Sequence, residues 1–357
     1  SFDSDSNLLT VENGILHLDT LELTPHTHTN LSKILIPCAF ITPKFDDIEG
    51  NLKDTLFWKY LKNSFTVKGK FIKEDFETVL EVMASVFIKH QIDEKSVMFL
   101  GNGENGKSVC LDYLSSLIGK NNISHIPLHK LAEDKFAMAK LDGKLANVFA
   151  DLEKNELRHT GCIKGISSGE PCFVQNKGKD GFDLYPMCKL IFSTNKFPKV
   201  FDQTQGFFRR WIIIKWNRNF ENDPDRISNL KDTLIENQEE KNLVFSSLMK
   251  LAEHLKTKGK FTNTPDWKTV QKIWNQNADP VTDFIENYII ESSTWKTKRD
   301  TYQFYKETMF DKGEIPLGMG QFSKAFSEYY EESKSGSVRI WDNIDFRQPV
   351  QAKLGHF

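Results

Sequence analysis

The sequence predicts an α/β fold with a central parallel sheet, and two observations lead to that class. Four short apolar runs follow one another without alternation, as is typical of strands buried on both faces. They are VMFL (97–100), LANVFA (145–150), KLIFST (189–194) and WIII (211–214). Directly after the first run comes an amphipathic segment, GKSVCLDYLSSLIG, of the kind that connects parallel strands through a helix.

Length and composition restrict the class of protein further. The chain has 357 residues, enough for two or three domains, and 39% of them are hydrophobic, which excludes global disorder. The net charge of −2 neither favours nor excludes an anionic partner. Five cysteines without a C-x-x-C pair favour reduced thiols over disulfides or a zinc site.

The sequence carries no sign of a membrane or secretory protein. No apolar stretch approaches the roughly 20 residues of a membrane span, and the start, SFDSDSNLL, is polar rather than signal-like. We therefore expect a cytoplasmic protein. Because the chain opens without Met, we also expect it to be a fragment of something longer.

The segments around the predicted sheet differ in pattern. Residues 7–45 read as short β-like pieces around an Asn13-Gly14 turn, whereas 52–92 and 221–290 read as helical. Residues 298–357 read as a small unit with helices at 302–309 and 321–330. Two strand-like pieces, SVRIW and QPVQAKL, follow, so this unit is winged-helix-like. We predict four regions: 1–92, mainly helical; 93–220, the sheet core; 221–296, helices packing on it; and 297–357.

The stretch GNGENGKS matches the phosphate-loop pattern G-x-x-x-x-G-K-[ST], with a strand before it and a helix after it. Such a loop turns its backbone N–H groups toward phosphates, its lysine reaches the β/γ oxygens, and its serine hydroxyl binds Mg²⁺. A glycine-rich turn without a ligand is the alternative. The predicted ATP-binding residues are Gly101, Asn102, Gly103, Glu104, Asn105, Gly106, Lys107, Ser108 and Val109.

Hydrolysis also requires an acid near the end of a neighbouring strand. Asp151 directly follows LANVFA and is the stronger candidate, with Mg²⁺ held between it and Ser108; Glu153 is the second. The alternative is that both are helix-capping acids on a surface loop. Asn195 closes KLIFST, where its amide would orient the attacking water, although Asn is also a common turn residue.

A pair of arginines precedes the last apolar run, in GFFRRWIIIKW. Charges beside a buried strand need a function or access to solvent. Arg210 is the first candidate for an arginine finger that acts on the γ-phosphate of a neighbouring subunit. Arg209 is the second candidate, or a sensor or salt-bridge residue. Two solvated arginines are the alternative.

With these motifs in order, the chain resembles the superfamily 3 helicases of the AAA+ class, in their phage and plasmid primase–helicase branch. The resemblance runs from ENGILHLDTLELTPHT, similar to the N-terminal helicase-associated region, through FLGNGENGKS to GFFRRWIIIKW and the last 60 residues. One departure concerns the second acidic motif. Relatives often carry Glu there, whereas FADLEKNE leaves the catalytic acid open between Asp151 and Glu153.

The resemblance implies a hexameric ring that hydrolyses ATP with Mg²⁺ and pulls single-stranded DNA through its centre, next to a primase or polymerase domain. It identifies EPCFVQNKGKDGFDLYP as a DNA-binding hairpin with Lys177 and Lys179 in its turn, and Lys164 as a further DNA contact. Residues 161–218 contain ten Lys/Arg against four Asp/Glu, a local excess of basic charge. A solvated charged turn is the alternative.

Two functions follow from these expectations. The first is an ATP-driven DNA helicase motor. The second is a DNA-binding replication initiator or assembly module that binds ATP as a switch and turns it over little. A metabolic kinase would leave the arginine pair and the basic hairpin unexplained.

Overall fold

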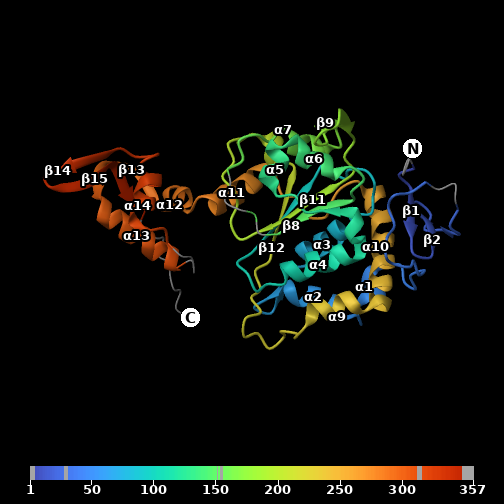
Figure 1. Ribbon diagram of the computed structural model, residues 1–357. Helices are drawn as coiled ribbons and strands as arrows, with labels where there is room; N and C mark the ends of the chain where they lie inside the picture. Colours follow the sequence, from blue (N-terminus) through green and yellow to red (C-terminus); the bar gives the residue numbers. More distant parts are fainter. Residues whose placement is uncertain (1–4, 28–30, 151, 153–155, 312–315, 348–357) are drawn as a thin grey trace. The chain divides into compact units, whose positions relative to one another are not determined.

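The computed structural model describes residues 5–27, 31–150, 152, 156–311 and 316–347. The chain divides into two compact units, Ser1–Gln271 and Lys272–Phe357 (Figure 1). None of the helices in the described ranges has the length and apolar character needed to cross a membrane.

The first unit contains the predicted parallel sheet. Its strand order is β12-β6-β11-β8-β7, and every neighbouring pair is parallel. The strands are β6 (Ser96–Leu100), β7 (Ile123–Ser124), β8 (Ala146–Phe149), β11 (Lys189–Thr194) and β12 (Trp211–Lys215). The four apolar runs are therefore strands, as predicted, and the α/β class is confirmed. The sequence did not indicate β7, because two residues are too few to form a pattern.

The strand order brings together segments that are distant along the chain. β11 lies between β6 and β8, with Thr194 opposite Leu100 and Phe192 opposite Phe149. The carboxyl ends of these three strands therefore meet at one edge of the sheet, which is where ligands bind in open α/β folds.

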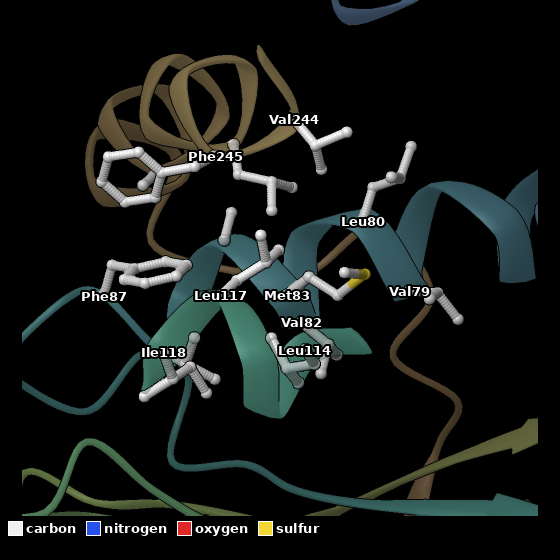
Figure 2. Packing of buried hydrophobic residues seen from close by; sticks show 14 of the residues in the cluster. Val79, Leu80, Val82, Met83, Phe87, Leu114, Leu117, Ile118, Val244 and Phe245 are labelled. Carbon is white, nitrogen blue, oxygen red and sulfur yellow. The ribbon is translucent and has the colours of Figure 1, made fainter. Parts of the chain in front are cut away.

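Three helices from different parts of the chain contribute to one buried cluster with this sheet: α3 (Lys73–Ser85), α4 (Lys107–Ile118) and α10 (Gln238–Lys258), of which α10 packs on α3 (Figure 2). Val97 and Phe99 of β6 belong to the same buried cluster. Because successive side chains of a strand point to opposite faces, the intervening Met98, which is also buried, faces the other side. Burial on both faces explains why the strand sequences do not alternate.

The N-terminal segment combines a small sheet with helices. β1 (Leu8–Val11), β2 (Gly14–His17) and β3 (Leu23–Thr24) are antiparallel, with the predicted turn at Asn13-Gly14. Helices α1 (Ile48–Leu52), α2 (Leu56–Ser64) and α3 follow. The expectation that 52–92 is helical is wrong between α2 and α3. A tight hairpin of β4 (Thr66–Val67) and β5 (Lys70–Phe71) lies there, turning at Gly69 with φ of 76°.

Further elements extend the core between and after the sheet strands. They are α5 (Leu128–Glu133), α6 (Lys135–Met138), α7 (Gly161–Ser168), β9 (Cys172–Gln175), β10 (Gly181–Leu184), α8 (Gln205–Phe208), α9 (Leu230–Glu236) and α11 (Trp267–Ala278). β9 and β10 form the predicted antiparallel hairpin. The helices after β12 agree with the helical pattern of 221–290.

Among the residues that the structure describes, the second unit contains a three-stranded antiparallel sheet, ordered β13-β15-β14, together with helices. Its elements are α12 (Pro280–Tyr288), β13 (Ile289–Thr297), α13 (Lys298–Asp311), α14 (Met319–Phe326), β14 (Glu332–Ser335) and β15 (Val338–Phe346). The two predicted helices and the SVRIW strand are present. The predicted second strand, QPVQAKL, lies outside the described residues; β15 pairs instead with β13 and β14, neither of which was expected.

Candidate functional site

The glycine-rich loop connects the carboxyl end of β6 to the first turn of α4. Gly103 and Gly106 have φ of 91° and 89°, in the left-handed region where a side chain is disfavoured. Gly101 donates its N–H to the carbonyl oxygen of Thr194 at 3.2 Å, which ties the loop to the neighbouring strand β11. The sequence pattern thus adopts the strand, loop and helix arrangement that it predicts.

Lys107 and Asn195, predicted separately, meet in the structure. The Lys107 side chain is almost fully buried, and its Nζ lies 3.3 Å from Oδ1 of Asn195. Nζ also donates to the carbonyl oxygen of Gly101. Asn195 reaches the loop because it follows β11, the strand adjacent to β6.

Asn105 and Gly101 lie against the backbone of Trp216, the residue that directly follows β12. Asn105 Nδ2 donates to the carbonyl oxygen of Trp216 at 3.0 Å. A Cβ atom at Gly101 would lie 2.5 Å from that same oxygen and 2.2 Å from Asn105 Nδ2. Gly101 is therefore required for close backbone approach rather than for an unusual φ.

Tyr60 of α2 covers the end of the loop. Its hydroxyl donates to the carbonyl oxygen of Gly106 at 2.6 Å, and a Cβ atom at Gly106 would lie 3.0 Å from the ring. Burial raises the pKa of Tyr60 well above its ordinary value, so the phenol remains a hydrogen-bond donor throughout the physiological pH range. No spacing motif relates residue 60 to residue 106, and sequence reasoning missed Tyr60.

A cavity of about 580 Å³ opens over the loop, within the size range of small-molecule sites. Of the predicted residues, 103–109 and Asn195 line it, whereas Gly101 and Asn102 do not. The other lining residues were not predicted: Tyr60, Asn63, Ser193, Phe220, Asp225, Arg226, Ile227, Asn229, Leu230 and Lys231. They come from α2, the end of β11 and the segment after β12, where the sequence reads only as helix surface and loop.

The residues around this cavity fit a nucleotide with its metal ion. The amino end of α4 carries backbone N–H donors and a positive dipole end, and Lys107 supplies a cation. The exposed hydroxyl of Ser108 is available to a divalent cation. Asp151 and Glu153 lie outside the described residues. Leu152, between them in the sequence, donates its N–H to Ser193, a residue that lines the cavity.

The arginine pair lies at the amino ends of the strands, opposite the carboxyl ends where the loop lies. Trp211 begins β12 opposite Ser96, the first residue of β6, whereas the loop follows the last residue of β6. Arg210 is largely buried: its guanidinium donates to Ser168 Oγ at 2.8 Å and to the carbonyl oxygen of Gly206 at 2.5 Å. Burial, with the charge of Arg209, lowers the pKa of Arg210.

Arg209 is the more accessible member of the pair. Its side chain is 46% exposed, against 11% for Arg210, and it forms an ion pair with Glu94 at 2.6 Å. Neither arginine lines the cavity over its own loop. The exposures reverse the order of preference expected from the sequence, where Arg210 came first.

The lysines predicted to contact DNA occupy two different settings. Lys164 of α7 forms an ion pair with Asp202 at 2.9 Å. Burial alone would raise the pKa of Asp202, but hydrogen bonds from Thr160, Thr204 and Lys164 lower it below its ordinary value, so the Asp202 carboxylate stays ionised. Lys177 and Lys179 lie in the turn between β9 and β10 and are exposed.

Comparisons with known proteins agree with this arrangement. Residues 99–210 match the "Family of unknown function (DUF5906)", and residues 276–350 match the family "Poxvirus D5 protein-like". "Putative helicase 121R" of Invertebrate iridescent virus 3 is 24% identical over 228 residues, 61% of this chain. "Putative helicase 184R" of Invertebrate iridescent virus 6 is 25% identical over 168 residues, 44% of this chain.

The chain spans only 23% and 17% of the length of these two viral proteins. Among solved structures, the "A form apo structure of NrS-1 C terminal region-CTR" aligns over 94% of this chain and 95% of that one, with a TM-score of 0.45 and 11% identity.

The fold and the loop define an α/β protein with a P-loop-like core. The sequence matches agree with the resemblance noted from the motifs: parts of the chain are similar to a poxvirus protein family and to two viral proteins named as putative helicases.

Proposed function

We propose that this chain is an ATP-dependent DNA helicase motor of the superfamily 3 AAA+ type, which moves along single-stranded DNA as part of a larger viral or phage replication protein. One observation carries the proposal. The buried Lys107, at the start of α4, meets Asn195, which follows the neighbouring strand β11, beside a cavity that the glycine-rich loop lines. The relation to viral helicases supports the choice of DNA as the substrate.

The proposed roles follow from the positions of the side chains. ATP with Mg²⁺ would supply the free energy of phosphate hydrolysis. Lys107 would hold the β/γ-phosphate oxygens, the Ser108 hydroxyl and Asp151 would hold the metal ion, and Asn195 would orient water. Asp151 or Glu153 would polarise that water. On ATP binding, Nζ of Lys107 would exchange the carbonyl oxygen of Gly101 for phosphate oxygens.

The remaining element of the proposed site comes from another subunit. Arg209 and Arg210 lie at the opposite edge of the sheet from the loop, so an arginine finger from this pair would act on a neighbour's site. That arrangement requires an oligomer, for which we propose a hexameric ring. A covalently linked or associated primase or polymerase domain, a winged-helix role for the second unit and a cytoplasmic location complete the proposal.

The test is ATP hydrolysis with and without single-stranded DNA, measured together with strand unwinding and the mass of the assembly. Lys107→Ala and Ser108→Ala should each lose hydrolysis and unwinding together. Lys53→Ala, at an exposed lysine that directly follows α1, should retain both. Ser108 is exposed, so its variant should fold normally even if the buried Lys107 variant does not. Tight ATP binding with negligible turnover in the unmodified chain would instead identify a switch-type initiator module.

A further inference from the structure

The hairpin formed by β9 and β10 has one covered face and one open face. Val174 and Leu184 are buried, and Val174 pairs with Phe182 on that covered side. Phe173 points the opposite way, because neighbouring residues of a strand alternate, and its side chain is 64% exposed. The hairpin contacts α6 and α7 at the periphery of the first unit (Figure 1).

The tip of the Phe173 ring lies close to the backbone of Gly181 on the opposite strand. A Cβ atom at Gly181 would lie 2.2 Å from Cζ of Phe173 and less than 3 Å from two further ring atoms. The backbone of Gly181 is not in the left-handed region, so conformation does not require glycine there. The missing side chain instead leaves space for the tip of this ring beside the opposite strand, while most of Phe173 remains exposed.

The positive charge of this hairpin alone would not account for DNA binding, because carboxylates accompany its lysines. Lys177 and Lys179 share it with Asp180 and Asp183, and Asp183 lies directly across from Phe173. Five of the ten basic residues of 161–218 are also engaged internally. Lys164, Arg209, Arg210 and Arg218 pair with carboxylates, and the buried Lys189 donates to three backbone carbonyls.

A second exposed aromatic residue accompanies Phe173. Phe136, on α6, is 43% exposed, and Nζ of Lys135 lies 5.7 Å from the centre of its ring. Exposed rings next to lysines are the combination with which proteins hold single strands without reading sequence: bases stack on the rings and the cations contact the phosphates.

We propose that Phe173 is a stacking platform for a base of single-stranded DNA, with Lys177 and Lys179 contacting the adjoining phosphates. This inference rests on the proposed function and deepens it, because it assigns most of the affinity at the hairpin to an aromatic ring instead of to charge. A supported ring presents its exposed face at little entropic cost, since its rotamer is already restricted by the opposite strand.

The experiment measures binding of the full chain to a fluorescent oligothymidylate by anisotropy, over a range of salt concentrations. Phe173→Ala and Phe173→Leu should each weaken binding about tenfold, and Phe173→Trp should retain it. Phe201→Ala is the matched control: Phe201 is also exposed and lies near Lys199 and Arg158, but it is on a different segment, and its loss should change little.

Two further readouts distinguish stacking from a general loss of structure. Phe173→Ala should leave the slope of log affinity against log salt unchanged, whereas Lys177→Ala with Lys179→Ala should reduce its magnitude by about 1.4. An abasic oligonucleotide should bind the unmodified chain about as weakly as the thymidine form binds Phe173→Ala. The affinity for the abasic oligonucleotide should not fall further when Phe173 is replaced by Ala.

The outcomes separate the inference from the function on which it rests. If the chain binds DNA in a lysine-dependent manner but Phe173→Ala and the abasic strand change nothing, the stacking role is wrong while the motor proposal stands. If the unmodified chain binds no single-stranded DNA in the presence or absence of a non-hydrolysable ATP analogue, both are wrong.

Discussion

Tyr60 donates its hydroxyl proton to the carbonyl oxygen of Gly106 at 2.6 Å, and so connects α2 to the glycine that ends the loop. The amino end of α2 is itself held by Glu240 of α10, whose carboxylate accepts the N–H groups of Leu56 and Phe57 at 3.1 and 2.8 Å. A continuous set of hydrogen bonds therefore leads from α10 through α2 to the loop. The position of the loop therefore depends on α2, which precedes the sheet strands in the sequence, and on α10, which follows them.

Tyr60→Phe should weaken ATP binding severalfold and lower the free energy of unfolding by about 1 kcal/mol, because one buried neutral hydrogen bond is lost while the ring remains. Gly106 keeps a second donor, the N–H of Cys110 at 3.1 Å, so the loop should loosen and not unfold. The measurements are nucleotide affinity by calorimetry and urea unfolding.

Tyr113→Phe is the matched control for that experiment. Tyr113 is fully buried on α4 and stacks on Phe57, but its hydroxyl has no hydrogen-bond partner among the residues that the structure describes. Removing this hydroxyl should leave ATP affinity unchanged and stability equal or higher. Equal loss of affinity in the two variants would contradict the role given to the Tyr60 hydroxyl.

The two arginines should behave differently in mixed assemblies. Arg209→Ala removes a partly exposed ion pair, so the variant should fold normally and lose only ATP hydrolysis. Mixing it with Lys107→Ala subunits should restore activity at those interfaces where an intact Lys107 faces an intact Arg209. Arg210→Ala also leaves Ser168 and Gly206 without a donor and should lower the melting temperature. If mixing with Lys107→Ala subunits restores hydrolysis for Arg210→Ala but not for Arg209→Ala, Arg210 is the arginine that acts on the neighbouring subunit.

The hairpin lysines can be tested against a second turn of the same composition. Lys177→Ala with Lys179→Ala should keep basal ATP hydrolysis and lose its stimulation by single-stranded DNA, because the loop is untouched. The control is Lys68→Ala with Lys70→Ala in the β4–β5 turn, where two exposed lysines also flank a glycine of positive φ. Equal stimulation in both double variants would contradict a DNA contact at the hairpin.

Lys189 should make stability depend on pH. Its Nζ is buried and donates to the carbonyl oxygens of Ile88, His90 and Met187 at 2.9, 2.7 and 3.1 Å, and burial lowers its pKa from 10.5 to about 7. Between those two values the unfolded chain binds the proton and the folded chain does not. The free energy of unfolding should therefore rise with pH across this window, by at most about 1.4 kcal/mol per pH unit.

Lys189→Met removes that titration. The measurement is the free energy of unfolding in urea, between neutral and moderately alkaline pH. Its value for the unmodified chain minus its value for the variant should increase with pH. A constant difference would mean that the three carbonyl oxygens keep the folded-state pKa of Lys189 near its ordinary value.

Local patterns were sufficient to predict the main strands of the first unit's parallel sheet, but in the second unit they predicted two helices and only one of the three strands. The unalternated runs gave the four long strands of the sheet, and glycine spacing predicted a loop that the positive φ of Gly103 and Gly106 bears out. The hairpin around Lys177 and Lys179 was expected from the family resemblance, and the structure contains it. Short elements such as β7 and β14 were missed because they contain too few residues for a periodic signal.

By itself, the sequence determined the class of fold and the residues at the tips of its strands, because hydrophobic periodicity and turn chemistry are local properties. Only the tertiary structure decided which of those residues meet: Lys107 with Asn195 through the order of the strands, and Tyr60 with Gly106 through the packing of α2. It also decided which charges remain available. Burial and ion pairing depend on neighbours distant in the chain, so Arg210 and Lys164, equal to other cations in the sequence, are engaged within the fold.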